Sequence, residues 1–158
     1  MIKSILRLVF HQPEIPQNVG ALLRLSAAFQ IPIDFIGPFS FIWSDRQLKR
    51  ASLDYLPWAS YNKYTSFNQY QHSGAWHQRR HVFLVPSKGT PFCAFAFSPS
   101  DALVLGSESC GFPAEIEAQG DHFVHIPMFK SVRSLNVAMT GAIVLTWALG
   151  KQNHFQDL

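Results

Sequence analysis

The chain has 158 residues, of which 47% are hydrophobic, and this is ample for the packed core of one globular domain spanning residues 1–158. Only 15% of the residues are charged and the formal net charge is +3, so basic side chains must be grouped if they are to attract an anionic partner. The two cysteines, Cys93 and Cys110, form no CxxC pattern, which argues against a disulfide or cysteine–metal framework and indicates a reducing, cytoplasmic environment.

The N-terminal segment MIKSILRLVF predicts a strand rather than a targeting signal. Lys3 and Arg7 interrupt its apolar run and no cleavage site of small residues follows, so no signal peptide is expected. Residues 5–10 are apolar and rich in β-branched side chains, and the tripeptide HQP follows them. This pattern indicates a buried first strand that ends in a loop.

The first helix is predicted after this loop. Pro16 lies just ahead of the helical pattern, Asn18 is a suitable N-cap, and the apolar face continues to the break at Pro32. Arg24 falls within the helix. Residues 33–36 then predict a second short strand, which a Gly-Pro pair ends.

A short basic helix is predicted next, with Ser44 as its N-cap signal. Arg46 and Arg50 lie one helical turn apart with Lys49 beside them, so the helix presents a positive face to solvent. Such a face favours an anionic partner, although solubilising surface charges explain it about as well from charge alone. Further basic groupings are Arg79 with Arg80, and Lys130 with Arg133.

The middle of the chain alternates strand and helix signals and contains no internal repeat. Its predicted elements are a strand over residues 55–61 that Pro57 weakens, a weakly patterned helix over residues 66–77, apolar strands over residues 81–85 and 102–105, and a helix starting near Pro113.

The C-terminal part joins a polar loop to a long apolar helix. Residues 122–126 predict a strand, and the loop after it is rich in hydrogen-bonding side chains, which suits it to holding a ligand. The helix over residues 135–149 is apolar on nearly every side, so we expect a core or subunit-interface helix whose first turn presents Ser134 and Asn136. At about fifteen residues it is too short to span a bilayer.

Strands that alternate with helices predict an α/β fold with a mostly parallel sheet and helices on both faces. Ligands of such sheets bind beyond the carboxyl ends of the strands. Three of the predicted strands are followed by loops whose residue types suit a ligand site: PSKGT after Val85, GSESCGFP after Leu105 and PMFKSVRSLN after Ile126. A single pocket assembled from these three loops is the simplest prediction.

Several common sites are not supported by the sequence. No GxGxxG motif opens a helix after the first strand and no GxxxxGK[ST] motif occurs, so dinucleotide and P-loop sites are not predicted. His77 and His81 are four residues apart, but the second begins a strand and no acidic ligand accompanies them, so no metal site is predicted. No Ser/His/Asp nucleophile system stands out.

Three segments carry a resemblance to a known family. PEIPQNVGALLRLSAAF, GSESCGFP and IPMFKSVRSLNVA resemble the successive motifs of the 2′-O-ribose branch of the SPOUT class of RNA methyltransferases, and DRQLKRASLDY resembles its small TrmL-like subfamily. The resemblance implies a C-terminal deep trefoil knot, a homodimer and S-adenosyl-L-methionine bound in the knot. General topology disfavours a knot, and the resemblance overrides that expectation.

The resemblance assigns the cofactor to the loops around Val85, Gly106, Ile126 and Ser134. Gly106 permits close approach of backbone, and main-chain groups of Val85 and Ile126 are suited to reading adenine without charged side chains. Simple turn chemistry is the alternative explanation of Gly106.

The polar positions of the family's motifs match Asn18, Arg24, Glu108, Ser134 and Asn136, which we take as the catalytic set. Each has a structural alternative: an exposed helix arginine, a helix-entry carboxylate, or capping of the last helix. These alternatives are weaker jointly than singly, because the residues lie at separate strand ends. The sequence departs from the family at Val132 and Ala138, where hydroxyl side chains are frequent, which affects fine positioning rather than class.

The function implied is methyl transfer from S-adenosylmethionine to the ribose 2′-hydroxyl of the wobble nucleotide, a cytidine or modified uridine, in the tRNA anticodon loop. The predicted partners are tRNA and a second copy of the chain, with no membrane and no metal. Arg46, Lys49 and Arg50 are candidate phosphate contacts. The alternatives are 2′-O-methylation of ribosomal RNA and a non-catalytic RNA-binding protein of the same fold.

Overall fold

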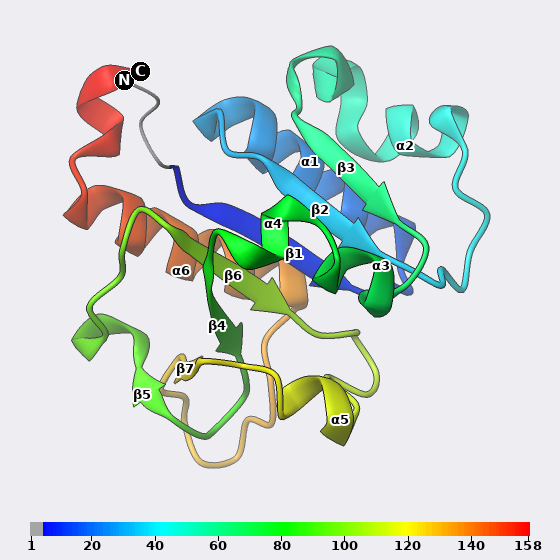
Figure 1. The fold of residues 1–158 in the computed structure, drawn as a ribbon. Helices are drawn as coiled ribbons and strands as arrows, with labels where there is room; N and C mark the ends of the chain where they lie inside the picture. Colours follow the sequence, from blue (N-terminus) through cyan, green and yellow to red (C-terminus); the bar gives the residue numbers. More distant parts are fainter. Residues whose placement is uncertain (1–4) are drawn as a thin grey trace.

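The computed structural model describes residues 5–158, so Lys3 and the rest of residues 1–4 lie outside the described residues. Seven strands form one parallel sheet in the order β3-β2-β1-β6-β4-β7-β5 (Figure 1). The strands are β1 (Arg7–His11), β2 (Ile33–Ile36), β3 (Tyr61–Tyr64), β4 (Arg80–Leu84), β5 (Thr90–Pro91), β6 (Asp101–Leu105) and β7 (His122–His125). Strands β1, β2 and β3 follow one another in sequence towards one edge of the sheet, and the chain then crosses to β4 on the other side of β1. The topological switch point of the sheet therefore lies between β1 and β6.

Helices cover both faces of the sheet, with α1 and α6 behind it and α3 and α4 in front in Figure 1. The α-helices are α1 (Pro16–Phe29), α2 (Asp45–Ser52), α3 (Phe67–Gln71), α4 (Gly74–His77), α5 (Ala114–Glu117) and α6 (Val137–Lys151). Short 3₁₀ helices are η1 (Leu53–Trp58), η2 (Phe92–Ala94) and η3 (His154–Asp157).

The alternation of side chains along the strands divides the core in two. On β1, Leu8 and Phe10 pack in the larger cluster with residues of α1 and α6, while Val9 packs in the smaller cluster with Phe67 and Tyr70 of α3. Both clusters are almost free of solvent, as the period-two alternation of a sheet covered on both faces requires. The predicted fold class is therefore confirmed.

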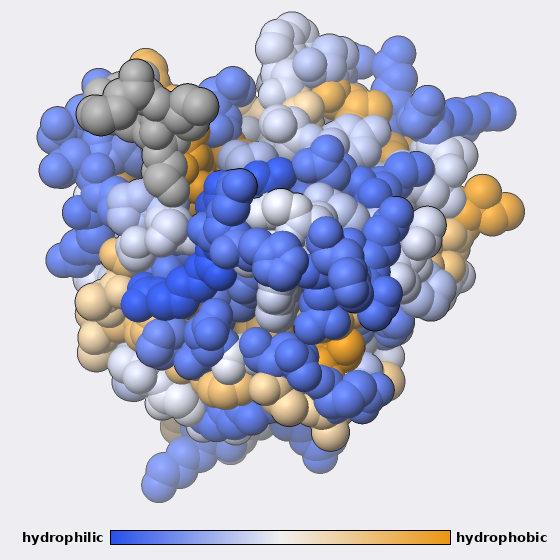
Figure 2. Space-filling view, viewed as in Figure 1, coloured by the Kyte–Doolittle hydropathy of each residue, from blue (hydrophilic) through white to orange (hydrophobic). Residues whose placement is uncertain are grey.

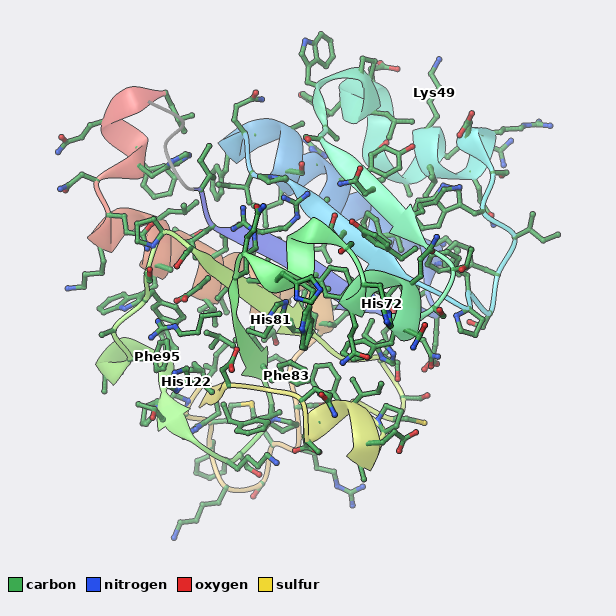
Figure 3. The ribbon with its side chains drawn as sticks, in the orientation of Figure 1. Lys49, His72, His81, Phe83, Phe95 and His122 are labelled. Carbon is green, nitrogen blue, oxygen red and sulfur yellow. The ribbon has the colours of Figure 1, made fainter. Side chains whose placement is uncertain are left out.

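His81 is part of the smaller core. Its Nε2 lies 3.0 Å from the hydroxyl of Tyr70, and its ring stacks on that of Trp76 at a centroid distance of 3.9 Å. Burial lowers the pKa of His81 to about 4. Figure 3 shows His81 and Phe83 in the interior, whereas Lys49 extends from α2 into solvent.

The prediction of a strand over residues 55–61 is wrong. Residues up to Trp58 form η1, and the strand begins only at Tyr61. Pro57 explains the difference, because it lacks a backbone N–H and suits a tight turn better than a sheet. The strands predicted over 5–10, 33–36, 81–85, 102–105 and 122–126 agree closely with β1, β2, β4, β6 and β7.

The single helix predicted over residues 66–77 is also wrong. It is divided into α3 and α4, and Ser66 caps the first by accepting a hydrogen bond from the amide of Gln69 at 3.1 Å. His72 and Ser73 separate the two helices, and Ser73 is the N-cap residue of α4, a position that serine prefers to a helix interior. The PSKGT loop contains one unpredicted element, the two-residue strand β5 beside β7.

Within residues 5–158, no helix is long and apolar enough to cross a membrane. The face of the molecule seen in Figure 2 is mainly hydrophilic.

Candidate active site

A cavity of about 460 Å³ opens at the carboxyl ends of the central strands, where the loops after β4, β6 and β7 meet the start of α1. This is the edge near the reversal between β1 and β6, where parallel sheets usually bind ligands. The three loops predicted to form one pocket do so, and the loop after β1 forms a fourth wall. The predicted site residues in its lining are Asn18, Val85, Gly106, Glu108, Ile126, Ser134 and Asn136.

Gly106 begins a tightly closed loop after β6. The amide of Ser107 donates to the carbonyl of Gly111 at 3.0 Å, and the amide of Gly111 donates to the carbonyl of Ser107 at 3.0 Å. A Cβ atom added at Gly106 would lie 2.7 Å from the carbonyl carbon of Gly111, closer than real contacts allow. The loop therefore requires glycine at this position.

Glu108 fastens this loop to the beginning of α1. Its carboxylate accepts hydrogen bonds from the amides of Glu14 at 2.8 Å and Ile15 at 3.1 Å, and from the side-chain amide of Asn18 at 3.1 Å. A carboxylate is favourable here because the helix N-terminus carries unpaired N–H groups and partial positive charge. Glu108 is thus a carboxylate at the N-terminus of a helix, and that helix is α1, whose residue Asn18 lies 90 residues earlier in the chain.

A second contact runs in the opposite direction. The hydroxyl of Ser109 donates to the carboxylate of Glu14 at 2.6 Å, and this hydrogen bond lowers the pKa of Glu14. The loop after β1 and the loop after β6 are therefore held to each other by two carboxylates. Neither Glu14 nor Ser109 was a predicted site residue, although both lie in the quoted motifs.

Asn18 does not cap α1, contrary to the prediction. The helix begins at Pro16, and Asn18 lies inside its first turn, buried. Pro16 suits the first helical turn because its missing N–H would be unpaired there in any case. Because it does not cap the helix, the Asn18 side chain is available to accept a hydrogen bond from the side-chain amide of Asn136 at 3.0 Å.

Asn136 links this network to α6. It is the N-cap of α6, and its side-chain oxygen accepts from the amides of Ala138 at 2.9 Å and Met139 at 3.2 Å. Asn136 therefore caps α6 with its side-chain oxygen while its side-chain amide group donates to Asn18. The capping alternative and the motif assignment do not exclude each other. Glu108, Asn18 and Asn136 form one hydrogen-bonded chain that joins three loops.

Ser134 lines the cavity from the loop between β7 and α6. Its hydroxyl makes no hydrogen bond to another group within the described part of the chain, so it is free to bond a ligand. Lys130 and Arg133 in the same loop are exposed.

An ion pair that was not predicted lies at the edge of the cavity. Lys88, from the PSKGT loop, pairs with Glu117 of α5, and its ammonium lies 4.2 Å from the ring centroid of Phe123. Both charged side chains line the cavity. Lys88 belongs to the predicted PSKGT loop, but its partner was not predicted, because Glu117 belongs to a helix formed by distant residues.

Arg24 is the one predicted site residue outside the cavity of the single chain. It is exposed on α1, with its guanidinium carbon 5.0 Å from the ring centroid of Tyr55. Among residues 5–158, no group of three His, Cys, Asp or Glu side chains is placed to hold a metal ion.

Comparison with known proteins adds independent information. The family model described as the SpoU rRNA Methylase family matches residues 5–146. The tRNA (cytidine(34)-2′-O)-methyltransferase of Beijerinckia indica is 40% identical over 145 residues, which cover 90% of this chain and 89% of the relative.

Solved structures of RNA methyltransferases also resemble this chain. A structure from work on the 2-OH methylation of C/U34 on tRNA matches with a TM-score of 0.88 and 34% identity, covering 94% of this chain and 97% of that one. The SpoU methyltransferase AviRb from Streptomyces viridochromogenes, solved with its cofactor AdoMet, shares the fold at 21% identity, with a TM-score of 0.82 and coverage of 96% of this chain and 62% of that one.

Proposed function

The chain belongs to the SpoU rRNA Methylase family, and from that premise we propose that it transfers the methyl group of S-adenosylmethionine to the ribose 2′-hydroxyl of nucleotide 34 of tRNA. The observation that carries this proposal is the cavity at the carboxyl ends of the strands, into which the loops bearing all three motifs converge. Family membership also implies the C-terminal trefoil knot that the resemblance predicted.

The cavity fits S-adenosylmethionine in size and chemistry. Its volume of about 460 Å³ lies in the range of small-molecule cofactor sites. Apolar side chains of Leu105, Ile126 and Met128 offer contacts to an adenine ring, and the free hydroxyl of Ser134 offers a polar contact. We assign cofactor binding to the loops around Val85, Gly106, Ile126 and Ser134.

S-Adenosylmethionine, when bound, supplies a methyl group on a positively charged sulfur, which departs as a neutral thioether. The protein therefore has mainly to align the acceptor hydroxyl, to within about 3 to 3.5 Å of the methyl carbon, and to stabilise the oxygen as its proton passes to solvent water. No metal is required for a displacement with such a leaving group.

We assign stabilisation of that oxygen to Arg24. A guanidinium stays protonated at neutral pH and is a poor base, but it binds a phosphate through two parallel hydrogen bonds and donates a hydrogen bond to an alkoxide oxygen. Because Arg24 is exposed and does not line the cavity in one chain, it is free to contact the phosphate next to the acceptor ribose and a developing alkoxide.

Glu108, Asn18 and Asn136 act as positioning residues in this scheme. Their hydrogen bonds to one another and to the start of α1 already use most of their polar atoms. They fix the relative positions of the loops that hold the cofactor and of the helix that carries Arg24.

The relatives favour tRNA over ribosomal RNA as the substrate. The match to the Beijerinckia protein extends over nearly the full length of both chains. Arg46, Lys49 and Arg50 are exposed on α2 and, among the described residues, form no ion pair, so they are available to tRNA phosphates. We place the enzyme in the cytoplasm, where it meets this substrate.

A homodimer through α6 completes the proposal. In one chain α6 buries only one face, and Met139 on the other is 56% exposed. An apolar groove of about 820 Å³ runs beside it, lined by Phe92, Ala142, Ile143, Thr146, Trp147, Gly150, Lys151 and Phe155. A second copy of α6 is the occupant that the resemblance implies.

Transfer of labelled methyl from S-adenosylmethionine to total tRNA from cells that lack this protein tests the proposal, followed by mapping of the labelled nucleotide. We expect label at the ribose of nucleotide 34. Absence of label with cofactor binding intact by calorimetry would redirect the assay to ribosomal RNA as the substrate, and absence of cofactor binding would leave a non-catalytic RNA-binding protein.

A further inference from the structure

We propose that the exposed rings of Tyr55 and Trp58 form a stacking surface for unpaired bases of the tRNA anticodon loop, next to the cationic face of α2. This proposal rests on the proposed function, because it takes tRNA as the substrate.

The two rings are turned towards solvent by the short helix η1. Trp58 is 63% exposed and Tyr55 is 44% exposed, with their ring centroids 6.4 Å apart. Leu56, between them, packs against the main core and anchors the helix. The neighbouring rings form a contiguous apolar patch rimmed by charged side chains, and such a patch indicates a contact surface.

The surroundings of the rings are mainly positive. The guanidinium of Arg24 lies 5.0 Å from the centroid of Tyr55, and η1 packs against both α1 and α2. Exposed charged side chains on these neighbouring elements are the cations Arg24, Arg46, Lys49 and Arg50 and the carboxylates Asp45 and Asp54. The cations outnumber the carboxylates, which favours a polyanion over an acidic or neutral protein segment.

Close packing holds this surface rigid. A Cβ atom added at Gly20 of α1 would lie 2.2 Å from the Cβ of Ala51 in α2, so the two helices touch at backbone distance. Ser52, buried at the junction of α2 and η1, donates its hydroxyl to the carbonyl of Leu48 at 2.7 Å. The backbone positions that carry the rings and the cations therefore keep a fixed relation to α1.

Aromatic rings beside cations match single-stranded nucleic acid. Any unpaired base stacks on an aromatic face while lysine and arginine contact the phosphates, whereas bases within a duplex are stacked on each other and unavailable. The anticodon loop provides unpaired bases on both sides of nucleotide 34, so stacking of a neighbouring base would help to fix the acceptor ribose.

The test compares Trp58→Phe with Trp58→Leu in the full chain. Phenylalanine keeps a ring and leucine keeps apolar volume without one, so only loss of stacking separates them. We expect Trp58→Leu to weaken binding of an anticodon stem-loop RNA by about tenfold and Trp58→Phe by much less. Ile42→Ala, which also removes exposed apolar surface but no ring, is the control and should bind like wild type.

Five further readouts separate stacking from other roles. Trp58→Leu should leave the salt dependence of binding, the melting temperature and S-adenosylmethionine affinity unchanged, and should raise KM for tRNA more than it lowers kcat. Tryptophan fluorescence of wild type should be quenched by the stem-loop but not by a duplex RNA, and the RNA-sensitive part should vanish in Trp58→Phe.

Equal RNA binding by Trp58→Leu, Tyr55→Leu and wild type would overturn the inference while leaving the proposed function intact, provided that wild type still methylates tRNA. Dissociation of the dimer by either leucine variant in analytical ultracentrifugation would assign the rings to a subunit contact and would overturn it too. Failure of wild type to methylate tRNA would instead remove the proposed function.

Discussion

Arg24 is the residue on which the proposed chemistry depends most. It lies on α1, whose first turn is fixed by Glu108, yet its guanidinium contacts only the exposed ring of Tyr55 among the described residues. Replacement by alanine should reduce methyl transfer by about 100-fold or more, because one donor to a developing oxyanion is lost. Affinity for S-adenosylmethionine, measured by calorimetry, should stay nearly unchanged, since Arg24 does not line the cofactor cavity.

Arg24→Lys is the matched control. It keeps the charge but not the paired hydrogen bonds of a guanidinium, so its rate should fall between those of wild type and the alanine variant. Loss of cofactor binding in Arg24→Ala would contradict the assignment of this residue to the acceptor.

We predict that His11 makes the free energy of unfolding depend on pH. It is buried at the end of β1, its Nδ1 has no hydrogen-bond partner among the described residues, and burial lowers its pKa to about 4. An unfolded chain protonates its histidines near pH 6.5, so between these values the unfolded state binds more protons. The free energy of unfolding should therefore decrease as pH falls from about 6.5 to 4, and His81 adds to the effect in the same direction.

His11→Phe isolates this contribution, because the new ring keeps the contacts with Phe67 and Phe112. Melting temperatures followed by circular dichroism from pH 7 to pH 4.5 should decline less steeply in the variant. Parallel profiles for the two proteins would show that His11 does not carry the acid sensitivity.

At the scale of elements, we predict that α2 is a separable source of RNA affinity. Its three cations project into solvent and their loss leaves the buried side chain of Leu48 in place. Replacing Arg46, Lys49 and Arg50 by glutamine should weaken tRNA binding and reduce the slope of log affinity against log salt by about one unit for each lost phosphate contact. Filter binding at several salt concentrations measures both quantities.

Arg46→Lys with Arg50→Lys conserves the charge of α2 and should keep the slope of wild type. If the glutamine variant keeps that slope as well, α2 does not contact phosphates.

The elements themselves were predictable where one physical signal dominated. Apolar β-branched runs located β1, β2, β4 and β6, and Ser44 correctly marked the start of α2, since its hydroxyl accepts from the amide of Gln47 at 3.2 Å. The strand expected over residues 55–61 failed because aromatic residues favour strands locally, whereas Pro57 and packing against α1 and α2 impose a 3₁₀ helix.

The loops that line the cavity could be predicted, whereas the hydrogen bonds between them could not, and Arg24, also a predicted site residue, lies outside the cavity. The motif residues Asn18, Gly106, Glu108, Ser134 and Asn136 do line one cavity. Their partners were not predictable, because Glu108 bonds amides of α1 and Lys88 pairs with Glu117 across distances in sequence that only the folded sheet brings together. Asn18 was mistaken for a cap because its local position suits capping, while its actual partners belong to distant loops.

At the scale of the whole molecule, the exposed face of α6 predicts self-association. Ile143 lies in the apolar groove and is partly exposed in one chain. Ile143→Asp should convert a dimer into a monomer, because a carboxylate buried without a partner is costly. Sedimentation should show the change in mass while circular dichroism shows an intact fold, and a variant that sediments like wild type would place the subunit contact elsewhere.

The central claim concerns the acceptor atom, and a tRNA with one altered ribose tests it most directly. A full-length tRNA carrying 2′-deoxyribose at nucleotide 34 is compared with one carrying the same change at the following nucleotide, both incubated with the enzyme and labelled S-adenosylmethionine. We predict no transfer to the first and normal transfer to the second. Transfer to the tRNA that lacks the 2′-hydroxyl at nucleotide 34 would contradict the assigned reaction.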